Sequence, residues 1–258
     1  MQRLIFPLVI GHRGFRSQFP ENTLVSFSAA IAAGADMIEL DVTFSKDRKV
    51  VVVHDDTLDR TTSGSGPVYK MTLHELRQLD AGKWFDDRFS GELLPTLEET
   101  LAFAADTGAR INIEIKSSAW EPNTPEDAIE RRIVDMAIQK HLLENILISS
   151  FQPGFLENLA ALQLHPEYAL ITGRTKPHDI VDVCTRLKVF SWHPHHETLK
   201  QPDIEAMHQA GIRVFPYTVN TPEDIHRLVT MGVDGIITDD PALAVSCLAP
   251  YRHARSIS

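Results

Sequence analysis

The sequence predicts an α/β fold, a (β/α)8 TIM barrel with a small insertion after the second strand. Its 258 residues are 43% hydrophobic and 23% charged, which suits one large core. Short apolar runs alternate with segments of helical period, the pattern of repeated parallel β-α units. Polar residues gather at the carboxyl ends of the predicted strands, and in a barrel these ends meet at one mouth. An open doubly wound sheet is the alternative.

Apolar runs and capping signals define the individual elements. Buried parallel strands are short continuous apolar runs, whereas helices begin at polar caps and have a period near 3.6. The predicted strands are Leu8–Ile10, Met37–Val42, Ile111–Lys116, Asn145–Phe151, Tyr168–Thr172, Val189–His193, Arg213–Thr218 and Gly235–Thr238. The predicted helices, with their caps, are Glu21–Ala33, Thr96–Asp106, Pro125–Lys140, Gly154–Leu164, Asp179–Arg186, Pro202–Ala210 and Pro222–Met231.

Residues 55–94 depart from this regular pattern. Glycine, serine and proline are dense at Thr61–Pro67, and a short helical piece is predicted at Leu73–Leu79. Such a density of turn-forming residues indicates an excursion from a repeated fold. We therefore predict a single barrel domain over residues 1–258, with a small inserted subdomain at 55–94.

The second strand continues into a hairpin that carries polar residues. Side chains alternate along a strand, so Glu39 and Asp41 share one face. If Asp47–Arg48 forms a two-residue turn, Asp41 lies opposite His54 on the returning arm. The hairpin is therefore expected to place two carboxylates and an imidazole together.

The third strand of the predicted barrel also alternates. Asn112, Glu114 and Lys116 share one face and isoleucines occupy the other. A solvated antiparallel face is one explanation, but a parallel strand covered by helices has no such face. A buried carboxylate and ammonium must be paired, metal-bound or functional.

Three carboxylates from neighbouring strands, Glu39, Asp41 and Glu114, predict a metal site. Such a cluster repels itself without a cation, and hard oxygen ligands suit Mg²⁺ or Ca²⁺ better than Zn²⁺. We therefore expect one divalent cation as cofactor, either Mg²⁺ or Ca²⁺.

Two histidines and two basic residues are expected beside this site. His12 and His54 stand at strand ends, and either one alone is more often a structural residue. Arg13 and Lys116 suit phosphate oxygens, although both could simply pair with the carboxylates. Together with a hard cation, these groups indicate phosphoryl transfer or phosphodiester cleavage with acid/base catalysis.

Charge and hydropathy exclude several partners. The net charge is −10 without a block of like charges, which argues against nucleic acid or an anionic membrane surface. No apolar run approaches the roughly 20 residues of a membrane span. The first ten residues lack a signal-peptide cleavage site. Cys184 and Cys247 lie in apolar contexts and are predicted to be buried thiols. We therefore predict a soluble cytoplasmic protein whose main partner is neither nucleic acid nor a membrane.

Several spaced motifs resemble those of the glycerophosphodiester phosphodiesterase family, in its bacterial cytoplasmic type. The resemblance covers nearly the whole chain, and its motifs occur in order, which makes it more specific than any single motif. They are His12-Arg13-Gly14, Pro20-Glu21-Asn22-Thr23, Glu39-Leu40-Asp41-Val42, Val52-Val53-His54-Asp55 with 57–62, Glu114-Ile115-Lys116, Thr218-Val219-Asn220 and Thr238-Asp239.

This resemblance implies a function and a role for each site residue. It implies hydrolysis of glycerophosphodiesters to glycerol 3-phosphate and an alcohol, by water or through attack of the substrate's own glycerol hydroxyl. It implies that Glu39, Asp41 and Glu114 hold the cation, that His12 and His54 form the acid/base pair, and that Arg13 and Lys116 hold phosphate. His12 would be the base and His54 the acid, an order that the sequence alone does not fix.

The sequence departs from the family pattern at three positions, one of which is Asp56, where the motif after His54 usually has proline. Tyr217 replaces the usual tryptophan, so an aromatic substrate-binding wall is kept while substrate preference can differ. Arg48 stands where the hairpin turn usually has glycine. Three further histidines, His193, His195 and His196, are interpreted as pocket or rim residues rather than as a second metal site.

Three other functions are compatible with parts of this pattern. A lysophospholipase D would act on lipid-tailed diesters and would need an apolar entrance. A non-catalytic phosphodiester-binding barrel would be expected to lack a histidine or a carboxylate of the site, and all five are present. A Schiff-base aldolase would use Lys116 as nucleophile, which the neighbouring Glu114 disfavours.

Overall fold

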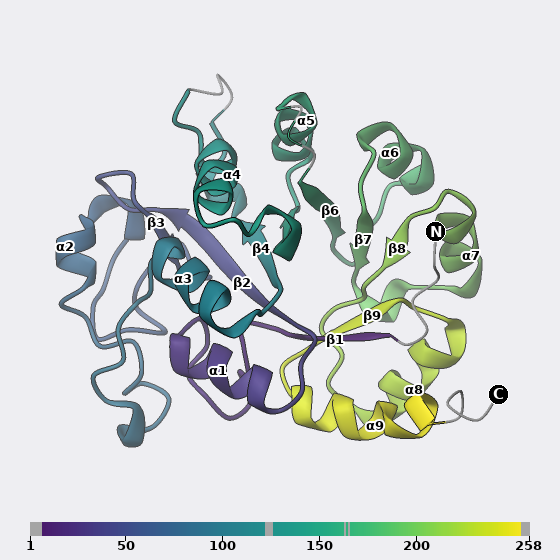
Figure 1. Ribbon diagram of the computed structural model, residues 1–258, viewed down its shortest axis with the longest axis horizontal. Helices are drawn as coiled ribbons and strands as arrows, with labels where there is room; N and C mark the ends of the chain where they lie inside the picture. Colours follow the sequence, from purple (N-terminus) through teal and green to yellow (C-terminus); the bar gives the residue numbers. More distant parts are fainter. Residues whose placement is uncertain (1–6, 122–125, 163, 165, 254–258) are drawn as a thin grey trace.

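The protein is a parallel β-barrel surrounded by helices, as predicted (Figure 1). The computed structural model describes residues 7–121, 126–162, 164 and 166–253. The sheet has nine strands within these residues. They are β1 Leu8–Gly11, β2 Met37–Phe44, β3 Val50–Val52, β4 Ile111–Ile115, β5 Ile146–Ser150, β6 Glu167–Thr172, β7 Ser191–Pro194, β8 Arg213–Val214 and β9 Gly235–Thr238.

Eight of these strands follow one another around the barrel in the order β8-β7-β6-β5-β4-β2-β1-β9. Backbone hydrogen bonds join the two ends of this path, from Asp234 N to Val214 O at 3.0 Å and from Ile237 N to Pro216 O at 3.0 Å. Strand β8 is shorter than predicted. Its extension contains Pro216, which has no N–H to contribute to a ladder.

The helices surround the barrel, and several of them begin at side-chain caps. Thr96 and Glu99 form the predicted capping box, and Thr23 caps the first helix. The α-helices are α1 Leu24–Ala32, α2 Leu73–Leu76, α3 Leu97–Thr107, α4 Ile129–Gln139, α5 Pro153–Ala161, α6 Ile180–Leu187, α7 Gln201–Gln209, α8 Pro222–Met231 and α9 Pro241–His253. The 3₁₀ helices are η1 Val68–Lys70, η2 Asp87–Phe89, η3 Ser117–Ala119, η4 Leu143–Asn145 and η5 His196–Thr198.

Helices α4 and α9 are among those that differ from the prediction. Helix α4 begins at Ile129, and the predicted start at Pro125 lies outside the described residues. Helix α9 was not predicted, because its sequence is mostly apolar around the whole circumference and contains Pro250. It packs against α8 and β1, so tertiary contacts support it where a periodic pattern is weak. No helix among the described residues is long and apolar enough to cross a membrane.

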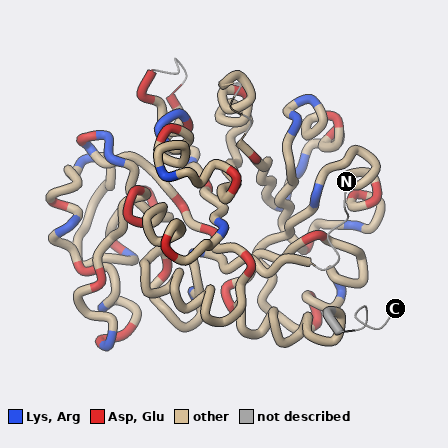
Figure 2. Tube along the Cα trace, viewed as in Figure 1, with Lys and Arg blue, Asp and Glu red and all other residues tan. Residues whose placement is uncertain are grey.

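Alternation along the strands separates two buried layers. Ile111, Ile113 and Ile115 are fully buried in the large cluster shared with the helices, as the alternating pattern predicted. The opposite strand faces contribute a second buried cluster, which includes Met37 and Phe215. The polar residues of β2 and β4 share this inner face. Acidic and basic residues are interspersed along the described chain, without a large region of one sign (Figure 2).

The register of the β2–β3 hairpin corrects the prediction. The strand pairs are Val42 with Val52, Thr43 with Val51 and Phe44 with Val50. The N–H of Val53 donates to the carbonyl of Asp41 at 3.0 Å, so the predicted pairing of Asp41 with His54 is wrong. The chain reverses through the three residues 46–48, because Arg48 adopts a left-handed conformation at φ 57°. Such a residue converts a two-residue turn into a three-residue one.

Residues 55–94, called the insertion below, have their own small core beside the barrel. Leu58, Val68, Leu76 and Leu94 are buried there against Val53 of the hairpin. Figure 1 shows this segment, with α2, to one side of β3 and α3. Helix α2 is shorter than the predicted Leu73–Leu79. The insertion therefore rests on the hairpin that carries His54.

Replacing Gly82 with alanine is expected to destabilise the insertion by about 1–3 kcal/mol, the usual range for overpacking. A Cβ at this buried position would lie 2.0 Å from the backbone carbonyl oxygen of Phe89. A backbone atom cannot move aside as a side chain can. Urea unfolding of Gly82→Ala and of Gly173→Ala would test this, because a Cβ at Gly173 meets no atom within 4 Å. Equal stability of the two variants would contradict the expectation.

Candidate active site

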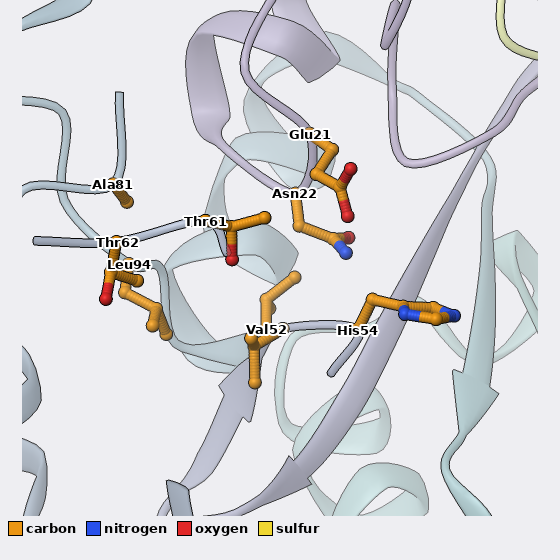
Figure 3. A pocket seen from close by; sticks show the side chains of 9 residues that line it. Glu21, Asn22, Val52, His54, Thr61, Thr62, Ala81 and Leu94 are labelled. Carbon is orange, nitrogen blue, oxygen red and sulfur yellow. The ribbon is translucent and has the colours of Figure 1, made fainter. Parts of the chain in front are cut away.

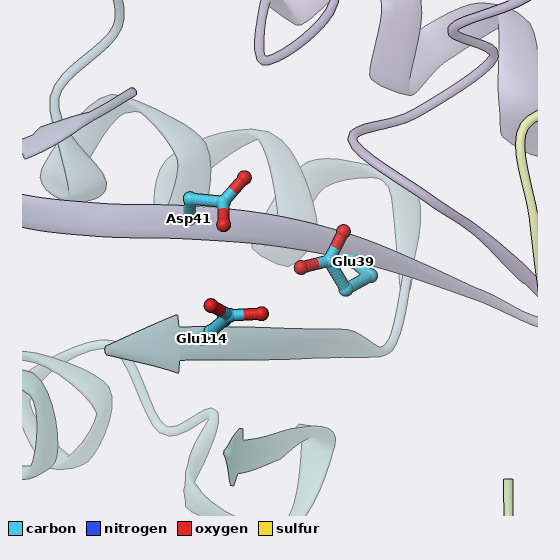
Figure 4. A group of neighbouring side chains, drawn as sticks. All are labelled: Glu39, Asp41 and Glu114. Atoms are coloured by element: carbon cyan, nitrogen blue, oxygen red, sulfur yellow. The ribbon is translucent and has the colours of Figure 1, made fainter. Parts of the chain in front are cut away.

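Three carboxylates converge inside the mouth of the barrel. Strands β2 and β4 are paired so that Asp41 lies beside Glu114 and Glu39 beside Asn112. One oxygen from each of Glu39, Asp41 and Glu114 lies within 4.8 Å of the others. Figure 4 shows the three side chains pointing toward one another from the two strands. Within the described part of the chain, this is the one group of acidic, histidine or cysteine residues with metal-site spacing.

The electrostatics of this cluster fit a hard divalent cation. Burial raises the pKa of Glu39 well above its ordinary value, and the charges of Asp41 and Glu114 act in the same direction. Burial, followed by the charge of Asp41, raises the pKa of Glu114 to about 7. Carboxylates that repel one another in a buried site, with oxygen as the only ligand atom, are the donor set that Mg²⁺ or Ca²⁺ requires.

Arg13 and Lys116 lie against the cluster. The Arg13 Nε is 3.3 Å from an oxygen of Asp41, and its backbone N–H donates to Glu39 at 2.8 Å. The Lys116 ammonium is 3.3 Å from Asp41 and 3.0 Å from Glu114. Burial alone would raise the pKa of Asp41, but the charges of Arg13 and Lys116 hold it below its ordinary value. Both basic groups therefore pair with the carboxylates, the alternative that the sequence left open.

His12 follows β1 and is oriented by an aspartate from the other end of the chain. Its Nδ1 is 2.6 Å from Asp239, and the second oxygen of Asp239 accepts a hydrogen bond from Asn220 at 2.8 Å. Burial lowers the pKa of His12, although the hydrogen bond to Asp239 acts in the opposite direction. A neutral ring that donates from Nδ1 leaves its Nε2 as an acceptor.

His54 follows β3 and has an equivalent partner. Its Nδ1 is 2.6 Å from Asp55, the next residue in the chain. Burial lowers the pKa of His54. Its side chain is 32% exposed, compared with 12% for His12, so His54 has the better access to solvent. His12 lines a pocket with Glu39 and Glu114. His54 lines a neighbouring pocket with Asn22, whose side chain donates to Asp41, so both histidines border the carboxylate cluster.

Several residues of the site were not predicted from local pattern. Asn22 was interpreted as part of a helix cap, but its side-chain amide donates to Asp41 at 2.9 Å. The side-chain oxygen of Asn22 also accepts a hydrogen bond from the backbone N–H of Asp41, at 3.3 Å. Asp55 is found from the sequence only within a family motif, whereas Asp239 also belongs to the polar residues at the predicted strand ends. Its position after a strand places Asp239 at the mouth of the barrel, but that position does not reveal its hydrogen bond to His12.

Tyr217 and the additional histidines occupy different depths of the mouth. Tyr217 lines a pocket with Glu39 and Glu114, and its hydroxyl donates to the carbonyl of Thr172 at 3.0 Å. His193 lines the same pocket and is buried, which lowers its pKa to about 3. His195 stacks on the ring of His196 at the rim, with centroids 5.3 Å apart. His193 is therefore a pocket residue, whereas His195 and His196 lie nearer the protein surface.

Comparison with known proteins identifies the family. Residues 12–243 match the model of the glycerophosphoryl diester phosphodiesterase family. The chain is 38% identical to a glycerophosphodiester phosphodiesterase of Caldanaerobacter subterraneus, over 93% of this chain and 96% of that protein. The resemblance inferred from the sequence motifs is thereby confirmed.

Solved structures give the same result. A phosphodiesterase of Oleispira antarctica in complex with the product sn-glycerol-3-phosphate has a TM-score of 0.86 at 31% identity, covering 95% of this chain and 97% of that chain. A glycerophosphodiester phosphodiesterase of Agrobacterium tumefaciens has a TM-score of 0.79 at 29% identity, covering 93% of this chain and 99% of that chain. The chain therefore belongs to the glycerophosphoryl diester phosphodiesterase family and is an enzyme of that class.

Proposed function

We propose that this protein hydrolyses glycerophosphodiesters to glycerol 3-phosphate and an alcohol, with one divalent cation and two catalytic histidines. The observation that carries the proposal is the arrangement of two histidine–aspartate pairs around one buried carboxylate cluster. Membership of the family and the product bound to the Oleispira antarctica relative support the substrate class. Glu39, Asp41 and Glu114 would hold Mg²⁺ or Ca²⁺, which would stabilise charge on the phosphoryl group.

The surroundings of the two histidines favour different roles. His12 is the more buried, and its Nε2 can accept a proton from the attacking hydroxyl of water or of the substrate's glycerol. His54 is more exposed and can take up a proton from solvent and donate it to the leaving alkoxide. Arg13 and Lys116 provide the positive charge that a phosphate needs. Tyr217 supplies an aromatic wall beside the substrate.

Chelation of the cation is expected to abolish turnover. Glycerophosphocholine would be incubated with the protein and Mg²⁺ or Ca²⁺, and glycerol 3-phosphate would be measured with a coupled dehydrogenase. We expect product formation with metal and a loss of at least about 100-fold with EDTA, because charge stabilisation by a metal contributes several kcal/mol. Restoring metal should restore the rate. Absence of metal-dependent product from any glycerophosphodiester would contradict the proposed function.

Further measurements separate the alternatives. A lysophospholipase D would release choline preferentially from the acylated substrate and would leave an acylglycerol phosphate, so choline release is the quantity to compare. A binding barrel would retain glycerol 3-phosphate in equilibrium dialysis but would form none. An aldolase would be inactivated by borohydride with a carbonyl substrate, through modification of Lys116. Preference for glycerophosphocholine over its acylated form is the outcome that supports our assignment.

A further inference from the structure

Glu21 is a buried carboxylate that accepts hydrogen bonds from three arginines. It is 4% exposed and lies in the loop before α1. Arg13 Nη1 donates to it at 2.7 Å and Arg16 Nε at 2.9 Å. Arg60 donates twice, with both distances 2.8 Å. Charge-assisted bonds of this kind are short and directional, so Glu21 fixes the three guanidinium groups relative to one another.

Arg60 connects this carboxylate to one of the catalytic histidines. It belongs to the insertion, and its Nε donates to Asp55 at 2.7 Å while its Nη2 donates to the other oxygen of Asp55 at 3.0 Å. Asp55 in turn bonds to His54. The planar fork of arginine can hold two carboxylates in a fixed relation, which the point charge of lysine cannot. The insertion thus reaches the His54 imidazole through Arg60.

Arg16 makes the corresponding connection to the other histidine. Its Nη1 lies 3.4 Å from Asp239, the partner of His12. The two histidines are therefore the ends of one continuous series of ion pairs, which passes through Glu21. Figure 3 shows that Glu21 and Asn22 line one side of a small pocket, opposite Thr61 and Thr62 of the insertion, with His54 at its edge.

We propose that Glu21 and Arg60 are positioning residues for catalysis, which set the orientation of both histidine–aspartate pairs and make the insertion part of the catalytic apparatus. The inference rests on the proposed function, in which His12 and His54 exchange protons with substrate. Neither Glu21 nor Arg60 needs to touch the substrate. Without Arg60, Asp55 loses its bidentate partner and the His54 ring loses the constraint that fixes its orientation.

The test compares two arginines that attach the insertion to the barrel. Arg77 is the matched control, because it bonds to Glu99 at 2.9 Å and is 30% exposed, compared with 40% for Arg60. We expect Arg60→Gln to lower kcat by about 10–100-fold with little change in KM, since a misplaced catalytic group costs about 100-fold. Arg77→Gln should keep the parental kcat. Arg60→Lys should recover only part of the rate.

A double variant tests the connection itself. Residues that act as one unit have non-additive effects on rate. Asp55→Asn combined with Arg60→Gln should therefore be little slower than Asp55→Asn alone. The proposal would be overturned if the fold-losses in kcat of Asp55→Asn and Arg60→Gln multiplied in the double variant. It would also be overturned by an unchanged kcat in Arg60→Gln, or by an equal loss of kcat in Arg77→Gln.

Nitrogen-15 NMR of the imidazoles gives a readout that is independent of turnover. In the parent, His54 should be a single tautomer with its proton on Nδ1, whereas Arg60→Gln should show a mixture and Arg77→Gln should match the parent. If the parent hydrolyses no glycerophosphodiester, the proposed function fails while the NMR comparison still decides the role of Arg60. Identical His54 spectra in the parent and Arg60→Gln would refute that role.

Discussion

Replacement of His12 by asparagine is expected to lower kcat by about 10²–10⁴-fold, the usual contribution of a general acid or base. Asparagine can still donate a hydrogen bond to Asp239, so the neighbouring network should persist while the acceptor at Nε2 is lost. Replacement of His54 by asparagine should have an effect of similar size. Neither histidine is a ligand in the proposed metal site, and both variants should bind Mg²⁺ or Ca²⁺ with parental affinity in calorimetry.

The pH dependence of the parent's activity is a second test of His12 as the general base. A general base loses activity when the pH falls through its pKa. Because burial lowers the pKa of His12 below its ordinary value of 6.5, the acidic limb of kcat/KM should lie below pH 6.5.

His208→Asn is the control for the substitution of His12, since His208 bonds to Asp234 at 2.8 Å, away from the mouth. Parental turnover in His12→Asn, or a loss of equal size in His208→Asn, would contradict the assignment.

The barrel could be predicted because its strands and helices are specified by patterns within short segments of the sequence. Apolar runs and helical periods repeat along the chain, and alternation alone separates the isoleucines of β4 from Glu114. The carboxylate cluster was predictable for the same reason, since parallel neighbours in a barrel place inward residues side by side. The hairpin register was not predictable, because it depends on whether Arg48 adopts a left-handed conformation that most residues avoid.

Contacts between distant segments explain what the sequence did not reveal about the site. Asp239 is 227 positions from His12, and no periodicity connects them. Asn22 and Glu21 resemble ordinary residues at a helix start, although only Thr23 acts as the cap. Arg60 lies in a segment without regular pattern. The proposed catalytic and metal-binding residues could therefore be identified from residue type and sequence pattern. The residues that orient them could be identified only from the three-dimensional structure.

The carboxylate cluster is expected to lower the stability of the metal-free protein, because the same negative charges that bind a cation repel one another without it. Glu39 is 3% exposed and faces two further carboxylates, so without a cation its charge opposes folding. Glu39→Gln keeps the shape and a carbonyl oxygen that can accept the Arg13 N–H, but it removes one of the repelling charges. We expect this variant to unfold at a higher temperature than the parent in EDTA, by about 2–4 °C for each kcal/mol gained.

The same substitution should weaken the cation site. A ligand set with one negative charge fewer binds Mg²⁺ or Ca²⁺ less tightly. Changing a residue that only supports a metal ligand already costs roughly 10-fold in affinity, so loss of a ligand charge should cost at least as much. Addition of metal should therefore stabilise the parent more than Glu39→Gln, and their order of stability should reverse. Glu130→Gln is the control: Glu130 is 3% exposed but accepts a hydrogen bond from Asn158 at 2.7 Å, outside the cluster. That variant should gain no stability in EDTA and should keep parental metal affinity. A Glu39→Gln protein that is less stable than the parent in EDTA would mean that the three carboxylates do not repel one another, and the argument for a cation between them would lose its basis.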